Sequence, residues 1–183
     1  MEGVEDIPET VLSEGIDFCW ETFPEYLNAL ESSSRIMDIG TQVPHSALRF
    51  FVKGDDGANH LCKPNEEQIS KMKSILEEAL CAGALGISTS RTTKHKSADG
   101  NLVPSLNADD KELAGIAEAL KNTKKGLLQC NSDMGPGEME SGNKLVVSGT
   151  SSRGTKTEDI YSLFGFTASL KLIDKALKLV QLF

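Results

Sequence analysis

The fold class is decided by the stretch Asn65-Glu-Glu-Gln-Ile-Ser-Lys-Met-Lys-Ser-Ile-Leu-Glu-Glu-Ala-Leu-Cys-Ala-Gly-Ala-Leu-Gly-Ile-Ser88. Asn65 can act as a helix N-cap, and Gln68 stands three residues later, as a capping box requires. The apolar residues that follow recur with helical period and are Ile69, Met72, Ile75, Leu76, Ala79 and Leu80. Gly83 is expected to end this helix. The short apolar run 84–88 is typical of a strand buried on both faces.

The same order of elements continues on both sides of this stretch. A short strand is predicted over 35–43, and a helix capped by Asn107 or Asp109 leads to another buried strand over 127–130. Residues 35–131 therefore alternate strand, helix, strand, helix, strand, which predicts a parallel α/β sheet with right-handed crossovers.

The remaining segments give weaker patterns. Residues 1–15 are interpreted as a loop, and an amphipathic helix is predicted over 20–30. The run 46–52 fits either a helical turn or a strand, and 89–106 is interpreted as a polar loop. Residues 135–157 have the composition of a Gly/Ser/Thr-rich linker, and 158–183 have the periodicity of an amphipathic helical tail.

The charge balance excludes one class of partner. Nineteen Lys and Arg face 27 Asp and Glu, which gives a net charge of −8 and a pI near 4.9. Nucleic-acid binding is not expected, because phosphate contacts need a cationic surface. The chain has no long apolar stretch and starts with an acidic segment that is unlike a signal peptide, so the sequence predicts a cytoplasmic protein without a membrane partner.

The potential metal ligands are sparse. Four cysteines, at 19, 62, 81 and 130, have wide and irregular spacing and are expected to be reduced and mostly buried. His60 and Cys62 are the only close pair of soft ligands, and two ligands cannot complete a zinc site.

The candidate functional residues are indicated by their position in the predicted sheet. In a parallel α/β fold these residues gather at the carboxyl ends of strands. The candidates by this rule are His45, Ser88, Thr89, Ser90, Arg91 and the polar group that ends in Asp133. The competing interpretation is a partly buried histidine bonded to the backbone, a solvated loop arginine and an aspartate in an Asx turn.

Several segments in order resemble one known family. They are Met-Glu-Gly-Val-Glu-Asp-Ile-Pro (1–8), Trp-Glu-Thr-Phe-Pro-Glu-Tyr-Leu (20–27), Gln-Val-Pro-His-Ser-Ala-Leu-Arg (42–49) and Ala-Gly-Ala-Leu-Gly-Ile-Ser-Thr-Ser-Arg (82–91). The set resembles the N-acyl-D-amino-acid deacylases, the D-aminoacylase-like branch of the amidohydrolase superfamily. The resemblance covers about residues 1–134.

The resemblance implies a metal-dependent hydrolase on a (β/α)₈ (TIM) barrel, of which this chain would supply about three βα units. Such an enzyme cleaves the non-peptide C–N amide bond of an N-acyl-D-amino acid, with zinc activating water and a carboxylate moving protons. The stretch 88–91 would line the substrate side, and His45 and Arg49 match a recurrent His and Arg with a structural or substrate-facing role.

The chain also departs from that family. Its His-x-His and Asn-Cys-Gly motifs have no counterpart here, so no metal ligand and no catalytic residue is assigned. The sequence therefore predicts the middle piece of a deacylase-like barrel joined to a foreign tail, inactive as an isolated chain.

Two alternatives stay open. Open strand edges could be completed by another chain or by self-association, which would restore an enzyme acting on a small N-acyl amino acid. Alternatively, the protein is a non-catalytic acidic interaction protein whose apolar stripe over 163–180 docks on a partner, unless that stripe packs on the protein's own core.

Overall fold

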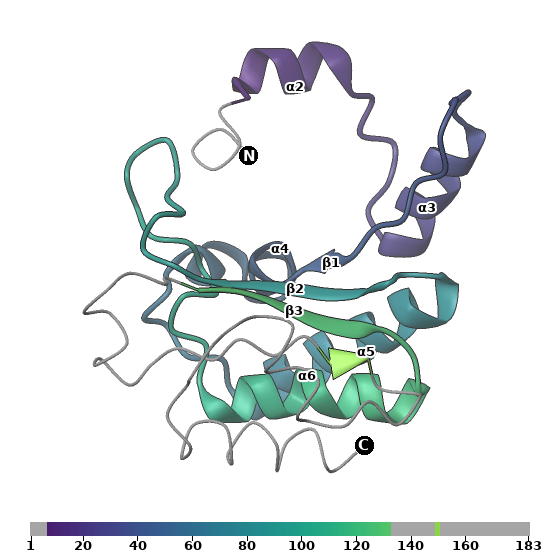
Figure 1. Ribbon diagram of the computed structural model, residues 1–183. Helices are drawn as coiled ribbons and strands as arrows, with labels where there is room; N and C mark the ends of the chain where they lie inside the picture. Colours follow the sequence, from purple (N-terminus) through teal and green to yellow (C-terminus); the bar gives the residue numbers. More distant parts are fainter. Residues whose placement is uncertain (1–6, 133–148, 151–183) are drawn as a thin grey trace, which may run out of the picture.

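A computed structural model describes residues 7–132 and 149–150 (Figure 1). The elements in chain order are α2 (Glu9–Gly15), α3 (Phe23–Ser32), β1 (Val43–Pro44), α4 (His45–Lys53), the 3-10 helix η1 (Gly54–Ala58), α5 (Glu66–Ala82), β2 (Gly86–Arg91), α6 (Asp110–Thr123), β3 (Leu127–Ser132) and β4 (Gly149–Thr150). No helix in the described part of the chain is long and apolar enough to cross a membrane.

The sheet has the order β1-β2-β3-β4. The first three strands are parallel, and Ile87 in β2 pairs with Val43 in β1 and Leu128 in β3. β4 is antiparallel to β3. The predicted α/β class with parallel strands is confirmed, whereas these strands do not by themselves make a TIM barrel.

One layer of helices covers one face of the sheet. Figure 1 shows α5 and α6 side by side under the strands, while α2 lies on the opposite side of the sheet. The two helices approach closely where Gly115 in α6 faces Ile69 in α5, because a Cβ on Gly115 would lie 2.6 Å from the Ile69 side chain. The core between helices and sheet is made by Val43, Leu48, Met72, Leu76, Ala79, Leu80, Ala84, Ile87, Ile116, Ala119 and Leu120.

The helix α5 matches the sequence prediction at both ends. Asn65 accepts from the backbone N–H of Gln68 at 2.8 Å, and the Gln68 side chain accepts from the backbone N–H of Asn65 at 3.0 Å. Gly83 follows the last turn with a φ of +123°, a conformation that favours glycine. The helix α6 begins after Asp109, whose carboxylate accepts from the backbone N–H groups of Lys111 and Glu112.

The structure resolves one open question and corrects three predicted boundaries. The undecided run 46–52 belongs to the helix α4. The strand predicted over 35–43 is shortened to β1, because Val43 is the residue of that run that pairs with β2. Before it the Thr41 carbonyl accepts from the Leu85 N–H at 2.8 Å, and Ile36 and Met37 remain exposed. β2 begins at Gly86 and extends to Arg91, so residues 89–91 are strand and not loop.

The N-terminal segment differs from its prediction as well. The helix α2 lies within residues 1–15, where the sequence predicts a loop, and it buries none of its side chains. The helix predicted over 20–30 is α3, which starts three residues later because Thr22 and Glu25 form a capping box. Trp20 lies before it and packs on Tyr26, with ring centroids 5.3 Å apart.

The predicted linker 135–157 and tail helix 158–183 lie outside the described residues, apart from β4. None of the four cysteines forms a disulfide bond. The expectation that most of them are buried is wrong, since Cys19 and Cys81 are exposed and the other two are half-buried.

Candidate functional site

A buried polar cluster joins α4, β2 and α6. His45 is the first residue of α4, directly after β1, and its side chain is fully buried. Its Nδ1 lies 2.8 Å from Thr89 Oγ1, and its Nε2 lies 3.0 Å from Glu112 Oε1. The cluster therefore connects residues that are 44 and 67 positions away from His45 in the sequence.

Arg49 completes this cluster from the next turn of α4, because residues four apart share one face of a helix. Its guanidinium NH1 donates to Glu112 Oε2, and its NH2 donates to the Cys62 carbonyl at 2.8 Å. Both Arg49 and Glu112 have side chains that are 1% exposed. The Arg49 Nε is buried without a hydrogen-bond partner among the described residues.

The carboxylate of Glu112 is the anion that balances the cluster. Burial by itself would raise the pKa of Glu112, but the hydrogen bonds and electrostatic attraction of His45 and Arg49 outweigh it and hold the pKa below the ordinary value of 4.5. An ionised carboxylate only accepts hydrogen bonds, so the His45 Nε2 must carry a proton and donate to it. In a neutral His45 ring, Nδ1 then accepts from the Thr89 hydroxyl.

The geometry suits a structural role for His45 and Arg49. Both ring nitrogens of His45 are engaged, and neither side chain is open to solvent. Of the two roles that the resemblance implies for them, structural and substrate-facing, the structural one fits this burial. A substrate-facing role for either residue stays a prediction.

A second polar cluster lies at the end of β2 and involves Ser90. The buried Ser105 Oγ donates to the Ser90 carbonyl at 2.9 Å and accepts from the Ser90 backbone N–H at 3.3 Å. It also accepts from Ser46 Oγ at 3.0 Å. The Ser90 Oγ lies 2.7 Å from His95 Nδ1. This cluster fixes the start of α4, the strand β2 and the loop after it to one another.

The other predicted residues lie around these two clusters. Thr89 points into the first cluster, as its bond to His45 shows. Arg91 NH1 donates to the Ala108 carbonyl at 2.7 Å. Ser88 is half-buried and lies on the opposite face of β2 from Thr89. Asp133 lies outside the described residues.

Sequence reasoning missed Glu112, Ser105 and His95. Glu112 had a detectable signal, because it stands on the same face of its helix as Ile116 and Ala119, and all three are buried. An acidic residue within an apolar stripe needs a buried partner. Ser105 and His95 lie in an irregular loop, where no periodicity reveals the direction of a side chain.

The described residues do not fit the zinc that the resemblance implies. Within residues 7–132 and 149–150, no group of three or more His, Cys, Asp or Glu could hold a metal ion. The His45 nitrogens are already bonded to Thr89 and Glu112. Burial raises the pKa of the Cys130 thiol to about 11, with Arg91 opposing the shift, so it is a poor source of thiolate.

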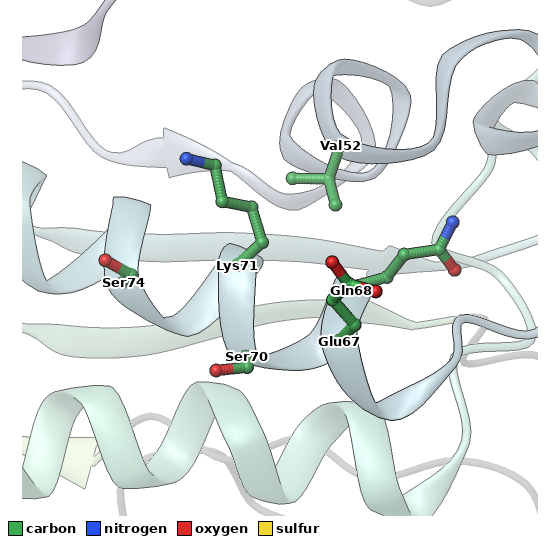
Figure 2. Close-up of a pocket in the computed structure, with 6 residues that line it drawn as sticks. All are labelled: Val52, Glu67, Gln68, Ser70, Lys71 and Ser74. Carbon is green, nitrogen blue, oxygen red and sulfur yellow. The ribbon is translucent and has the colours of Figure 1, made fainter.

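A shallow groove of about 480 Å³ lies between α4 and the outer surface of α5 (Figure 2). Its lining residues are Val52, Glu67, Gln68, Ser70, Lys71 and Ser74. None of the candidate site residues predicted from the sequence lines it. It is open to solvent, and no contact of the described residues assigns it a ligand.

The fold thus defines an α/β protein with a short parallel sheet, and comparison with known proteins adds a partial similarity. The chain is 35% identical over 82 residues to a D-aminoacylase of Alcaligenes xylosoxydans xylosoxydans, which covers 45% of this chain and 16% of that protein. It is 37% identical over 70 residues to uncharacterized proteins of Mycobacterium tuberculosis and Mycobacterium bovis, which covers 38% of this chain and 12% of theirs.

These matches are local. The chain spans less than a fifth of the length of the curated relatives it matches. No protein-family model matches the chain. No solved structure matches it either. The similarity supports a D-aminoacylase-like relation for part of the chain.

Proposed function

We propose that this chain forms part of a D-aminoacylase-like amidohydrolase that hydrolyses the amide C–N bond of N-acyl-D-amino acids. The observation that carries the proposal is the 35% identity over 82 residues to the Alcaligenes D-aminoacylase. The three parallel strands are consistent with it, because the predicted barrel is built from parallel strands.

Within this proposal the described residues divide into two roles. His45, Arg49 and Glu112 hold α4, β2 and α6 together on the helix-covered face of the sheet. Ser88 and Ser90 lie on the other face of β2, which would face the substrate. Arg91 ends β2 on the face of Thr89, where the Ala108 carbonyl holds its side chain, so it is not assigned to the substrate face. Asp133, which follows β3 in the sequence, stays a prediction for that face.

Metal chemistry is not assigned to the described residues. The resemblance implies zinc, and its ligands would have to come from residues beyond those described or from another chain. Of these two sources we propose the other chain, so we expect the isolated chain to bind substrate without hydrolysing it and turnover to need that second polypeptide.

The test measures binding and turnover separately. The 183-residue chain is titrated with N-acetyl-D-methionine and with its L enantiomer by calorimetry, and amino acid release is assayed with and without added Zn²⁺. The expected result is saturable binding that favours the D enantiomer, with no release.

A charge variant locates the binding face. Ser88→Asp places a negative charge on the proposed substrate face, so it should weaken binding of the anionic ligand by like-charge repulsion. Ser74→Asp on the outer surface of α5 is the matched control and should leave binding unchanged. Equal binding of the two enantiomers, or no binding, would overturn the substrate assignment. Stoichiometric hydrolysis by the pure chain would overturn the proposed need for a second polypeptide.

A further inference from the structure

We propose that Ser90 and His95 form a nucleophile–base pair that takes an acyl group from small carboxylic esters and passes it to water. This activity needs no metal and is separate from the amide hydrolysis proposed above. It is carried by the second polar cluster, at the carboxyl end of β2.

The two reacting groups are already in contact. The Ser90 Oγ lies 2.7 Å from His95 Nδ1, within the reach that a general base needs to remove the hydroxyl proton. Both residues are half-buried, so part of the surface of the pair meets solvent. His45, by contrast, also bonds a hydroxyl, that of Thr89, but that pair is sealed inside the protein.

The nucleophile is held by its own backbone. The fully buried Ser105 hydroxyl bonds both the N–H and the C=O of Ser90, and Ser46 anchors Ser105 from the start of α4. These bonds involve the Ser90 peptide and not its side chain. The Ser90 Oγ is therefore positioned by a rigid strand and remains free to react.

The base is carried by a structured loop. His95 precedes Lys96, which forms an antiparallel bridge with Leu102. The Ser97 N–H donates to the Asn101 carbonyl at 2.7 Å, a second backbone contact that joins the two sides of this loop. Figure 1 shows the loop after β2 rising on the side of the sheet away from α5 and α6.

Strand alternation places Ser90 on that same side. Ile87 and Thr89 are buried toward the helices, as the core packing of Ile87 and the bond of Thr89 to His45 show. Side chains at successive strand positions point to opposite faces, so Ser90 faces away from the helices. The pair thus lies at a strand end, where parallel α/β folds carry functional groups.

The chemistry balances without another cofactor. As the Ser90 Oγ attacks the ester carbonyl, its proton passes to His95 Nδ1. The bond from the carbonyl carbon to the alkoxy oxygen breaks, and the leaving alcohol takes the proton back from the ring. Water, deprotonated by the same ring nitrogen, then cleaves the acyl-Ser90 ester to give the carboxylic acid and restores both residues.

The experiment uses p-nitrophenyl acetate with the full chain, in the presence of EDTA. Release of p-nitrophenol is followed by absorbance, and the acetylated residue is identified by peptide mass mapping. We expect an acetyl group on Ser90 and ester cleavage that EDTA does not reduce. Ser90→Ala should abolish the mapped adduct, and His95→Gln should slow its formation by about 10²-fold, the usual contribution of a general base.

Matched variants distinguish reaction at Ser90 from reaction of the ester with other residues on the surface. Ser74→Ala and His60→Gln change the same residue types elsewhere on the protein and should leave the rate unchanged. Ser90→Ala keeps both backbone bonds to Ser105, so its circular dichroism and melting temperature should match those of the parent. Acetylation of lysines or the amino terminus without Ser90, or an unchanged rate in Ser90→Ala, would overturn the proposal.

Discussion

The sharpest prediction concerns Glu112→Gln. The Glu112 carboxylate accepts one hydrogen bond from His45 and another from Arg49, and all three side chains are at most 1% exposed. A glutamine has the same shape but carries no charge, and only one of its two terminal atoms can accept. The His45 ring can adapt by moving its proton to Nδ1, which then donates to Thr89. Arg49 cannot adapt, because its guanidinium stays charged.

The magnitude follows from the uncompensated charge. Removing one partner from a buried ion pair costs about 3–5 kcal/mol, because the remaining ion is left desolvated. The total unfolding free energy of a domain is about 5–15 kcal/mol, so this single change should consume a large part of it. The Arg49 Nε has no hydrogen-bond partner among the described residues, so it meets no other acceptor that could balance the guanidinium charge.

The assay is urea unfolding followed by circular dichroism, with unfolding free energies compared at a fixed slope. Glu118→Gln is the control, because Glu118 lies on the same helix and pairs with Lys73 at 2.7 Å while being 61% exposed. That change should cost about 0–1 kcal/mol. Adding Arg49→Met to Glu112→Gln should lose less stability than the two single changes summed, by about 0.5–3 kcal/mol. A Glu112→Gln loss as small as that of Glu118→Gln would refute the reasoning.

Three further predictions rest on individual residues. Folding lowers the pKa of Glu112, so the carboxylate stabilises the protein fully above the ordinary pKa of 4.5, and this stabilisation is lost as the pH falls through the lower pKa of the folded protein. Urea midpoints measured from pH 7 to pH 3 should therefore fall less steeply in Glu112→Gln than in the parent. Gly86→Ala should destabilise by about 4 kcal/mol or more, because φ is +150° and a Cβ would lie 2.0 Å from a carbonyl oxygen of β3; thermal melting checks this, and a near-parental melting temperature would contradict it. Cys130, with its pKa near 11, should react with a disulfide reagent at pH 8 well after the exposed Cys81. Mass mapping of the modified peptides at short times measures the order, and modification of Cys130 before Cys81 would contradict the prediction.

The elements that could be predicted are those determined by residues close to one another in the sequence. The helix α5 was predicted with both of its ends, because Asn65, Gln68 and Gly83 act on backbone groups within one turn. Strand lengths depend on partners far away in the chain. β1 is short because little of 35–43 meets a neighbour, and β2 is long because β3 pairs with it as far as Arg91.

The candidate site was predictable in position but not in its connections. The rule about strand ends selected His45, Thr89 and Ser90, all of which belong to the two polar clusters. The rule could not reveal that His45 faces Glu112, since a glutamate near the start of a helix usually faces solvent and favours the helix dipole there. His95 was equally hidden, because only the loop conformation brings it to Ser90.

The bonds of His45 have a consequence for how the protein opens. Since the His45 ring bonds β2 and α6 at once, detaching β2 removes the Thr89 hydroxyl from its buried Nδ1, and detaching α6 also separates the Glu112 carboxylate from Arg49. Amide protons in α4, β2 and α6 should therefore exchange with deuterium through one shared opening event. The helix α2 buries no side chains, so its amides should exchange through a separate and much easier opening. Within the described chain, the cluster thus joins α4, β2 and α6 into one unit that opens cooperatively.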